Sequence, residues 1–121
     1  MTVLVDTSVW VDHLRKGNQA LSALLEEGRI LCHPLVIGEL ACGNLRNRDE
    51  ILELLAALPQ ASSVTFEETF VFLETEKLHG RGLGWIDVQH LTAARLSGCP
   101  IWTLDRRLAK AARELSAAYD G

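Results

Sequence analysis

The chain has 121 residues, of which 48% are hydrophobic and 23% are charged, and its formal net charge is −4. This size and composition are typical of one globular domain, over residues 1–121, and exclude a disordered, collagen-like or disulfide-stapled chain. No run approaches the roughly 20 apolar residues of a membrane span, and the acidic balance argues against broad electrostatic binding of nucleic acid.

The chain opens on a short apolar segment, Val3–Val5, which predicts a buried strand. The segment is too short for a signal peptide and has no basic region before it, so we expect a cytoplasmic protein. Asp6-Thr7-Ser8 follows, and all three residue types are favoured at helix N-caps. Further strands are predicted at residues 29–33 and 100–104, with a candidate short strand at 63–66. A helix is predicted to end at residue 17, and others to cover residues 20–27, 34–44, 49–58, 67–79, 86–97 and 106–115.

Short apolar strands that alternate with helices are typical of an α/β domain with a mostly parallel, buried sheet. The sequence contains no internal repeat and no linker, so no second domain is expected. Three cysteines, Cys32, Cys42 and Cys99, are odd in number and widely spaced. This favours reduced core residues over a disulfide framework or a zinc site.

Two acidic residues stand directly after predicted strands. Asp6 follows the first strand, and Asp105 follows the last one. In open parallel sheets, the carboxyl ends of the strands are where ligands bind. Aspartate is also a preferred helix N-cap, so each residue taken alone has a purely structural interpretation.

Two further acidic residues share helical faces with apolar side chains. Glu39 lies within the apolar arc of the predicted helix at 34–44, where a buried carboxylate is costly unless it is paired or metal-bound. Asp87 shares a stripe with Leu91 and Ala94 of its own helix. The structural alternatives are that Glu39 reaches solvent at a peripheral helix end, and that Asp87 is a first-turn acid favoured by the helix dipole.

Together, the four acids indicate a metal site. Converging carboxylates repel one another, so a cluster of them persists mainly where a cation neutralises it. Oxygen ligands without histidine or cysteine suit Mg²⁺ or Mn²⁺ better than zinc. Such a site can activate water and neutralise phosphate charge, which predicts metal-dependent hydrolysis of a phosphodiester.

The residues resemble those of the PIN-domain ribonucleases, and within that group the VapC-type toxins of toxin-antitoxin pairs. The resemblance runs from Val3 to about Leu115. Four segments carry it: Asp6-Thr7-Ser8 after the first strand, Glu39-Leu40-Ala41-Cys42-Gly43, Asp87 at the start of a later helix, and Thr103-Leu104-Asp105-Arg106-Arg107-Leu108. It implies a PIN-like three-layer sandwich, in which helices flank a mostly parallel central sheet.

The resemblance also implies an endoribonuclease that depends on Mg²⁺ or Mn²⁺ and cuts single-stranded regions of tRNA, rRNA or mRNA to block translation. It implies homodimers and inhibition by a small cognate antitoxin as well. Ser8 and Thr103 match family positions that support the site by hydrogen bonding. The acids that carry over as catalytic are Asp6, Glu39, Asp87 and Asp105, and those that carry over as metal ligands are Asp6, Asp87 and Asp105.

An RNA substrate would have to be held by local positive charge, since the net charge is negative. Arg107, beside Asp105, is the preferred phosphate contact because a planar guanidinium matches phosphate geometry. A solvated charged face is the alternative for any one arginine. The four histidines show no metal-ligand spacing, so they are expected in ordinary surface or packing roles. The other basic candidates are Arg15, Lys16, Arg46, Arg48, Arg81 and Arg106.

Two departures from the family pattern are visible. Gln89-His90 puts polar residues where the family is usually apolar, and the tail after Leu115 is short for a final strand. Two other functions are also open. A signalling receiver domain would need paired acids after its first strand and a lysine after a late strand, whereas Asp6 is single and Lys110 lies inside a predicted helix. The second alternative is a catalytically inactive PIN domain that acts as an RNA-binding or assembly module.

Overall fold

The computed structural model describes residues 1–120, and a parallel sheet lies at its centre. The strands are β1 (Val3–Val5), β2 (Ile30–Leu31) and β3 (Ile101–Trp102), in the spatial order β2-β1-β3. Both neighbours of β1 run parallel to it. The helices are α1 (Thr7–Lys16), α2 (Gln19–Glu26), α3 (Pro34–Ala41), α4 (Arg48–Ala57), α5 (Phe66–Thr75), α6 (Trp85–Ser97) and α7 (Arg106–Glu114).

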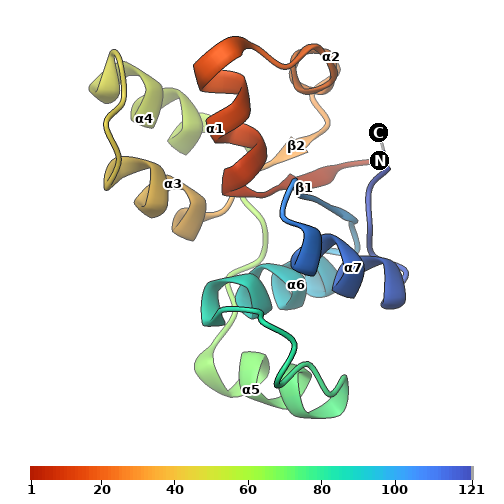
Figure 1. Cartoon of the computed structure of the whole chain (residues 1–121). Coiled ribbons are helices and arrows are strands. Elements are labelled where there is room, and N and C mark those ends of the chain that lie inside the picture. Colours follow the sequence, from red (N-terminus) through yellow and green to blue (C-terminus); the bar gives the residue numbers. More distant parts are fainter. Residues whose placement is uncertain (121) are drawn as a thin grey trace.

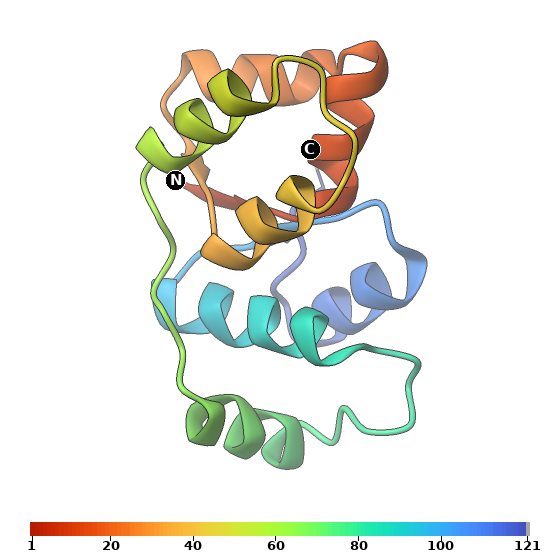
Figure 2. The same ribbon diagram turned by 90° about the vertical axis from the view of Figure 1, so that its left-hand side faces the viewer.

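Helices cover both faces of the sheet, so the molecule has three layers (Figures 1 and 2). Helices α1 to α4 lie on one side, and α6 and α7 lie on the other with α5 outside α6. Successive side chains of a strand point to opposite faces. Val3 and Val5 accordingly pack in the core under α1 to α4, while Leu4 packs in the core under α6 and α7. The predicted α/β three-layer sandwich is therefore confirmed.

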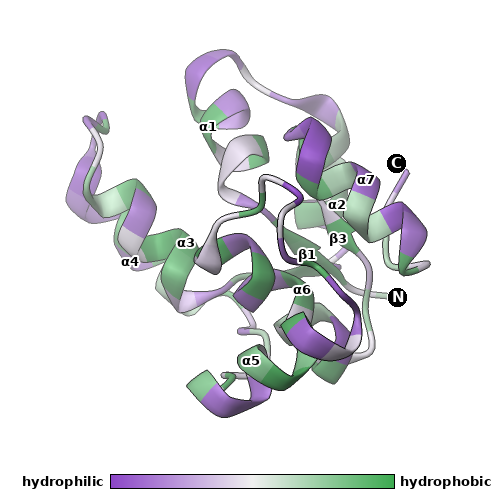
Figure 3. Ribbon diagram, turned by 60° about the horizontal axis from the view of Figure 1, so that its bottom comes forward, coloured by the Kyte–Doolittle hydropathy of each residue, from purple (hydrophilic) through white to green (hydrophobic). Residues whose placement is uncertain are grey.

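Helices α6 and α7 approach the sheet closely because their inner faces carry small residues. Ala93 and Ala94 of α6 and Ala111 and Ala112 of α7 are fully buried. Figure 3 shows the hydrophobic colour concentrated on the strands and on the inner helix faces. No helix in the described part of the chain is long and apolar enough to cross a membrane.

The short tail after α7 lies along the free edge of β3. Ile101 donates its N–H to the carbonyl of Ala117 and accepts from the N–H of Tyr119, at 2.8 and 2.9 Å. Ala118 forms an isolated parallel bridge with Ile101. The tail is therefore long enough to pair with this edge of the sheet, although it forms no regular strand.

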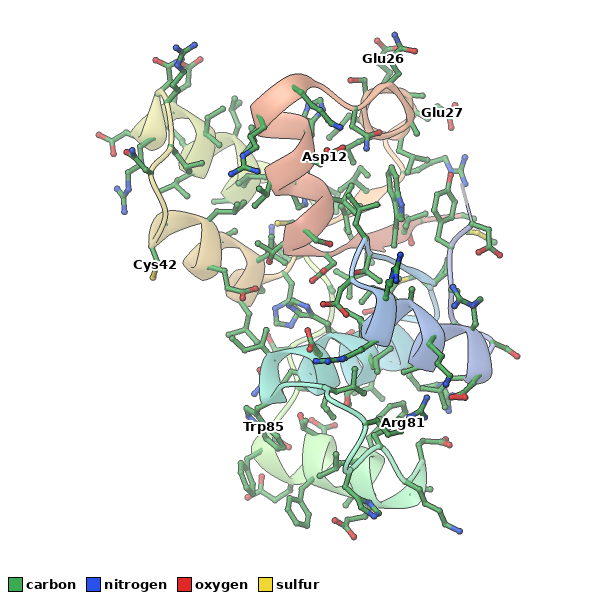
Figure 4. All side chains as sticks on the ribbon, in the orientation of Figure 1. Asp12, Glu26, Glu27, Cys42, Arg81 and Trp85 are labelled. Carbon is green, nitrogen blue, oxygen red and sulfur yellow. The ribbon has the colours of Figure 1, made fainter. Side chains whose placement is uncertain are left out.

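Two expectations about local structure were wrong. The candidate strand at 63–66 does not form, because Thr65 and Glu68 make a capping box and the chain enters α5 at Phe66. The bridge to Cys32 comes from Gln60 instead. Cys42, predicted in the core, is exposed at the outer end of α3 (Figure 4), because α3 ends at Ala41 before a further turn could cover it.

Candidate active site

Asp6 lies at the carboxyl end of the central strand, where the sheet meets the start of α1. Its backbone N–H donates to the carbonyl of Trp102 at 2.9 Å, which ties it to β3. Asp6 is also the N-cap of α1, and only 6% of its surface is exposed. The two interpretations of this residue, helix cap and buried strand-end acid, therefore both hold.

Two hydroxyl groups converge on one oxygen of Asp6. The Ser8 Oγ and the Thr103 Oγ1 each donate to Oδ2 at 2.8 Å. Each hydroxyl in turn accepts a backbone N–H, from Leu104 at 2.9 Å and from Asp105 at 3.0 Å. Because an ionised carboxylate can only accept, both hydroxyl protons are directed toward Asp6, and the network links β1, α1 and the segment after β3.

Three helix N-termini meet at this point. Asp6 caps α1, Asp105 caps α7 by accepting from the Leu108 N–H at 2.9 Å, and Asp87 lies in the first turn of α6. Asp87 Oδ2 accepts the N–H of Gly84 at 2.9 Å. Helix N-termini carry partial positive charge and favour anions, so they help to hold these carboxylates close together.

The pKa of Asp6 is lowered in the folded protein, whereas the pKa of Asp87 is raised. Burial acts to raise the pKa of Asp6, but its contacts with His90, Thr103 and Ser8 outweigh burial, and the net pKa lies below the usual 3.8. Burial also raises the pKa of Asp87, and the negative charges of Asp6 and Asp105 raise it further against the Gly84 hydrogen bond. The surroundings thus favour the carboxylate form of Asp6, whereas the charges of Asp6 and Asp105 disfavour the carboxylate form of Asp87.

Glu39 lies outside this cluster, in which Asp6 is buried, Asp87 is half-buried and Asp105 is exposed. Its side chain is exposed on α3, so the prediction that it points into an apolar arc was wrong. The helix is short and its outer end is peripheral, which leaves this position open to solvent. Thr7 Oγ1 donates to Glu39 Oε1 at 2.6 Å, so Glu39 is joined to the residue that follows Asp6.

The donor chemistry fits a hard divalent cation, although the carboxylates do not close into a cage. No three His, Cys, Asp or Glu side chains within residues 1–120 stand in a metal-holding arrangement. Mg²⁺ usually keeps several waters and takes only one or two protein carboxylates. Asp6 and Asp87, with Asp105 nearby, supply oxygen donors of that kind.

Arg107 lies against the loop that leads into α6. A Cβ placed on Gly82 would come within 2.7 Å of the Arg107 Cδ and 3.0 Å of its Nε. Gly82 has a φ of +75°, a region that glycine adopts without strain. The loop therefore packs its backbone on the Arg107 stem beside the start of α7. Arg81, another basic candidate, lies on the same loop (Figure 4) and is paired with Glu114.

A groove of about 810 Å³ leads away from Thr7 and Glu39, between α1, α3 and the segment before α4. Arg15 and Arg46 line it together with apolar side chains. Two of the basic candidates thus face a cleft that begins beside Glu39. Of the other three, Lys16 and Arg48 pair with Asp12 and Asp49, and Arg106 is the exposed first residue of α7.

Two histidines that the sequence did not assign to the site lie here, His90 beside Asp6 and His33 beside His90. His90 is fully buried, and its Nδ1 lies 3.3 Å from Asp6 Oδ1. The His33 ring lies 5.1 Å from the His90 ring, centroid to centroid. A signal for both was present: His33 follows β2 as Asp6 follows β1, and His90 comes three residues after Asp87, on the same helical face.

Comparisons with known proteins agree with this geometry. A family model described as PIN domain matches residues 3–114. Two relatives named Ribonuclease VapC32, from Mycobacterium tuberculosis strains CDC 1551 / Oshkosh and ATCC 25618 / H37Rv, are each 44% identical over 117 residues, covering 96% of this chain and 94% of their own. The solved structure of FitAcB from Neisseria gonorrhoeae is similar with a TM-score of 0.66 and 19% identity, covering 93% of this chain and 94% of that one. PAE2754 from Pyrobaculum aerophilum is similar with a TM-score of 0.62 and 17% identity, covering 92% of this chain and 79% of that one.

Proposed function

Because this chain belongs to the PIN-domain family, we propose that it is a metal-dependent endoribonuclease and the toxin of a toxin-antitoxin pair. The observation that carries the proposal is the meeting of Asp6, Asp87 and Asp105 at three helix N-termini, with Asp87 under repulsion from the other two. The 44% identity to proteins named ribonucleases supports RNA as the substrate. The substrate would be single-stranded regions of tRNA, rRNA or mRNA, cut in the cytoplasm so that translation stops.

Asp6, Asp87 and Asp105 would hold Mg²⁺ or Mn²⁺. When bound, such a cation supplies Lewis acidity to a phosphodiester and lowers the pKa of water. Ser8 and Thr103 fix the carboxylate of Asp6 through its Oδ2. Glu39 is exposed and is held by Thr7, so it can accept a proton from an attacking water.

The metal dependence has a direct test. Purified protein is expected to cut a labelled single-stranded RNA in Mn²⁺ or Mg²⁺, to lose the activity in EDTA, and to regain it when Mn²⁺ is added in excess. An inactive PIN module would bind the same RNA without shortening it. Full cleavage in EDTA would contradict the proposal, and so would RNA that stays intact in Mn²⁺ across the substrates tried.

Arg107 is proposed to contact a substrate phosphate, because its side chain lies between the start of α7 and the loop before Asp87. Arg107→Ala is expected to lower kcat/KM by roughly tenfold at low salt, with a smaller effect at high salt, since charge-assisted phosphate contacts are screened. Arg113→Ala, at the far end of the same helix, is the matched control and should change little. An unchanged cleavage rate for Arg107→Ala at low salt would make the residue part of a solvated face.

A small antitoxin protein is the proposed partner. Expression of the chain alone should arrest growth, and co-expression with the neighbouring small open reading frame should restore it. Growth that is unaffected by expression of an active nuclease would contradict the toxin part of the proposal while leaving the nuclease part intact.

A second copy of the chain is the other proposed partner. Apolar side chains on α5 and α6 form an exposed surface, with Phe66 at 5.9 Å from Phe70 and 5.1 Å from Trp85 between ring centroids. Figure 4 shows Trp85 beside α5. Exposed patches of this kind mark protein interfaces.

Phe70→Glu is therefore expected to shift a dimer toward monomer in sedimentation velocity at micromolar concentration. Leu54→Glu, at an exposed apolar position on α4, is the matched control. A wild-type protein that is monomeric at high concentration would contradict the dimer.

A further inference from the structure

His90 is a buried polar side chain for which the proposed chemistry has no use. It lies on α6 with 0% of its surface exposed. Its Nδ1 lies 3.3 Å from Asp6 Oδ1, yet neither ring nitrogen has a hydrogen bond of full geometry among residues 1–120. Burying an imidazole without strong partners is unfavourable, so an apolar side chain would serve a purely structural core better here.

The neighbouring His33 has a defined tautomer. It is the N-cap of α3, and its Nδ1 accepts the N–H of Leu35 at 3.0 Å. Burial and the nearby His90 lower the pKa of His33 to about 4, so the ring is neutral at pH 7. A neutral ring that accepts at Nδ1 must carry its proton on Nε2. That Nε2 is buried and has no hydrogen-bond partner within residues 1–120.

The rings of His33 and His90 pack against each other, and the His90 ring also contacts Asp6. They are 5.1 Å apart with an interplanar angle of 67°, an edge-to-face arrangement. Within residues 1–120, neither His33 Nε2 nor His90 Nε2 has a hydrogen-bond partner, so the two rings interact by edge-to-face packing. Nδ1 of His90 faces a carboxylate oxygen, so this nitrogen must carry a proton to avoid two opposed lone pairs.

We propose that His90 is a positioning residue for Asp6, donating its Nδ1–H to Oδ1 while His33 supports the His90 ring from behind. The proposal rests on the proposed function. The hydroxyls of Ser8 and Thr103 and, more weakly, the Ser8 backbone N–H at 3.5 Å donate to Oδ2, which leaves no lone pair on this oxygen free. His90 takes one lone pair of Oδ1 and leaves one free. The histidine pair thereby fixes the rotation of the carboxylate and leaves a single oxygen position available for a cation.

The test compares two variants of His90, one that only fills the space of the ring and one that also keeps a hydrogen-bond donor. His90→Leu fills the space without a donor, and His90→Asn places an amide N–H near the position of Nδ1. Mn²⁺ affinity, measured by water-proton relaxation, is expected to fall 10- to 100-fold in His90→Leu and to stay within a few fold of wild type in His90→Asn. His79→Leu, at an exposed histidine, is the matched control.

Stability discriminates positioning from packing. The thermal midpoint of His90→Leu should fall, because the donor that faces the Asp6 carboxylate is lost, and His90→Asn should recover part of that fall. A lower midpoint with unchanged Mn²⁺ affinity would mean that His90 only packs, and would overturn the proposal.

Imidazole ¹⁵N NMR on the wild-type protein gives a readout that needs no variant to fold and no RNA to be cut. The expected pattern is a proton on Nδ1 of His90 and a neutral His33 with its proton on Nε2. A deprotonated Nδ1 on His90 would overturn the proposal whatever the variants do. If the wild type shows the expected tautomers and binds Mn²⁺ but cuts no RNA, the nuclease proposal fails while the positioning role stands.

Discussion

Asp6→Asn is expected to reduce RNA cleavage by on the order of a thousandfold, corresponding to about 4 kcal/mol of transition-state stabilisation lost with a metal ligand. It should also destabilise the fold by ~2 kcal/mol, because contacts to a charged group are lost. Ser8 and Thr103 donate hydrogen bonds to this carboxylate, and His90 Nδ1 lies 3.3 Å from its Oδ1. An asparagine amide brings a further donor among them. Single-turnover cleavage in Mn²⁺ and urea unfolding measure the two effects.

The pH dependence of this loss follows from the lowered pKa of Asp6. A carboxyl whose pKa is lower in the folded state contributes stability that is present above its unfolded pKa of 3.8, and that is lost as the pH falls through the folded pKa. The stability gap between wild type and Asp6→Asn should therefore close in acid.

Asp12→Asn is the matched control, since Asp12 lies on the same helix and pairs with Lys16. It should keep full activity. The sequence alone favours the opposite stability change for Asp6→Asn, because one member of a repelling cluster is neutralised. A free energy of unfolding that is higher for Asp6→Asn than for wild type would mean that relief of repulsion outweighs the lost contacts.

Asp87→Asn is expected to abolish cleavage to a similar degree, of the order of a thousandfold, while raising the stability of the fold. Burial and the charges of Asp6 and Asp105 raise the pKa of Asp87. The ionised form of Asp87 is therefore less favourable in the folded protein than in the unfolded chain. An asparagine oxygen still accepts the N–H of Gly84, so the capping bond of α6 is kept. The gain is about 0.5 kcal/mol after discounting for solvent, or roughly 2 °C in Tm.

The sign of the pH effect is the reverse of that for Asp6. A carboxyl with a raised folded pKa contributes stability that is fully present below its unfolded pKa of 3.8, and that is lost as the pH rises through the folded pKa. The advantage of Asp87→Asn over wild type should thus be largest at neutral pH and vanish in acid.

Asp49→Asn is the matched control for Asp87→Asn, because Asp49 is an exposed first-turn acid on α4. It should lose a few tenths of a kcal/mol as its interaction with the helix dipole disappears. Equal behaviour of the two variants would mean that Asp87 is an ordinary first-turn acid and that no repelling cluster exists.

Local signals in the sequence were sufficient to predict most of the fold. Val3–Val5 is an apolar run that stops at a cap residue, and Asp6 and Asp105 are strand-end acids that also begin helices. Strand ends and helix caps are decided by neighbours in the chain, so their positions could be predicted without the sheet order. The start of α5 could also have been predicted, because Thr65 and Glu68 have the spacing of a capping box.

Contacts across the sheet could not be predicted in the same way. His33 and His90 meet because β2 lies next to β1, which brings the start of α3 toward α6. The position of each histidine along the chain indicates that it lies near the site, but nothing in either segment indicates that the two rings meet. The exposure of Glu39 likewise depends on where α3 ends and on whether another element packs over this residue. Helical periodicity alone does not give this information, because it is decided by tertiary packing.

The hydrogen bond between Thr103 and Asp6 joins residues separated by 97 positions. The segment that carries Thr103 is held at β1 by a strand whose outer edge pairs with residues 117–119. During synthesis, β1 can pair early with β2, but its pairing with β3 must wait until Trp102 has been made, and such long-range pairing forms slowly. A nascent chain that stops short of Thr103 lacks both the hydroxyl that holds Asp6 and the carboxylate of Asp105, so the cluster cannot assemble before residue 105 has been made.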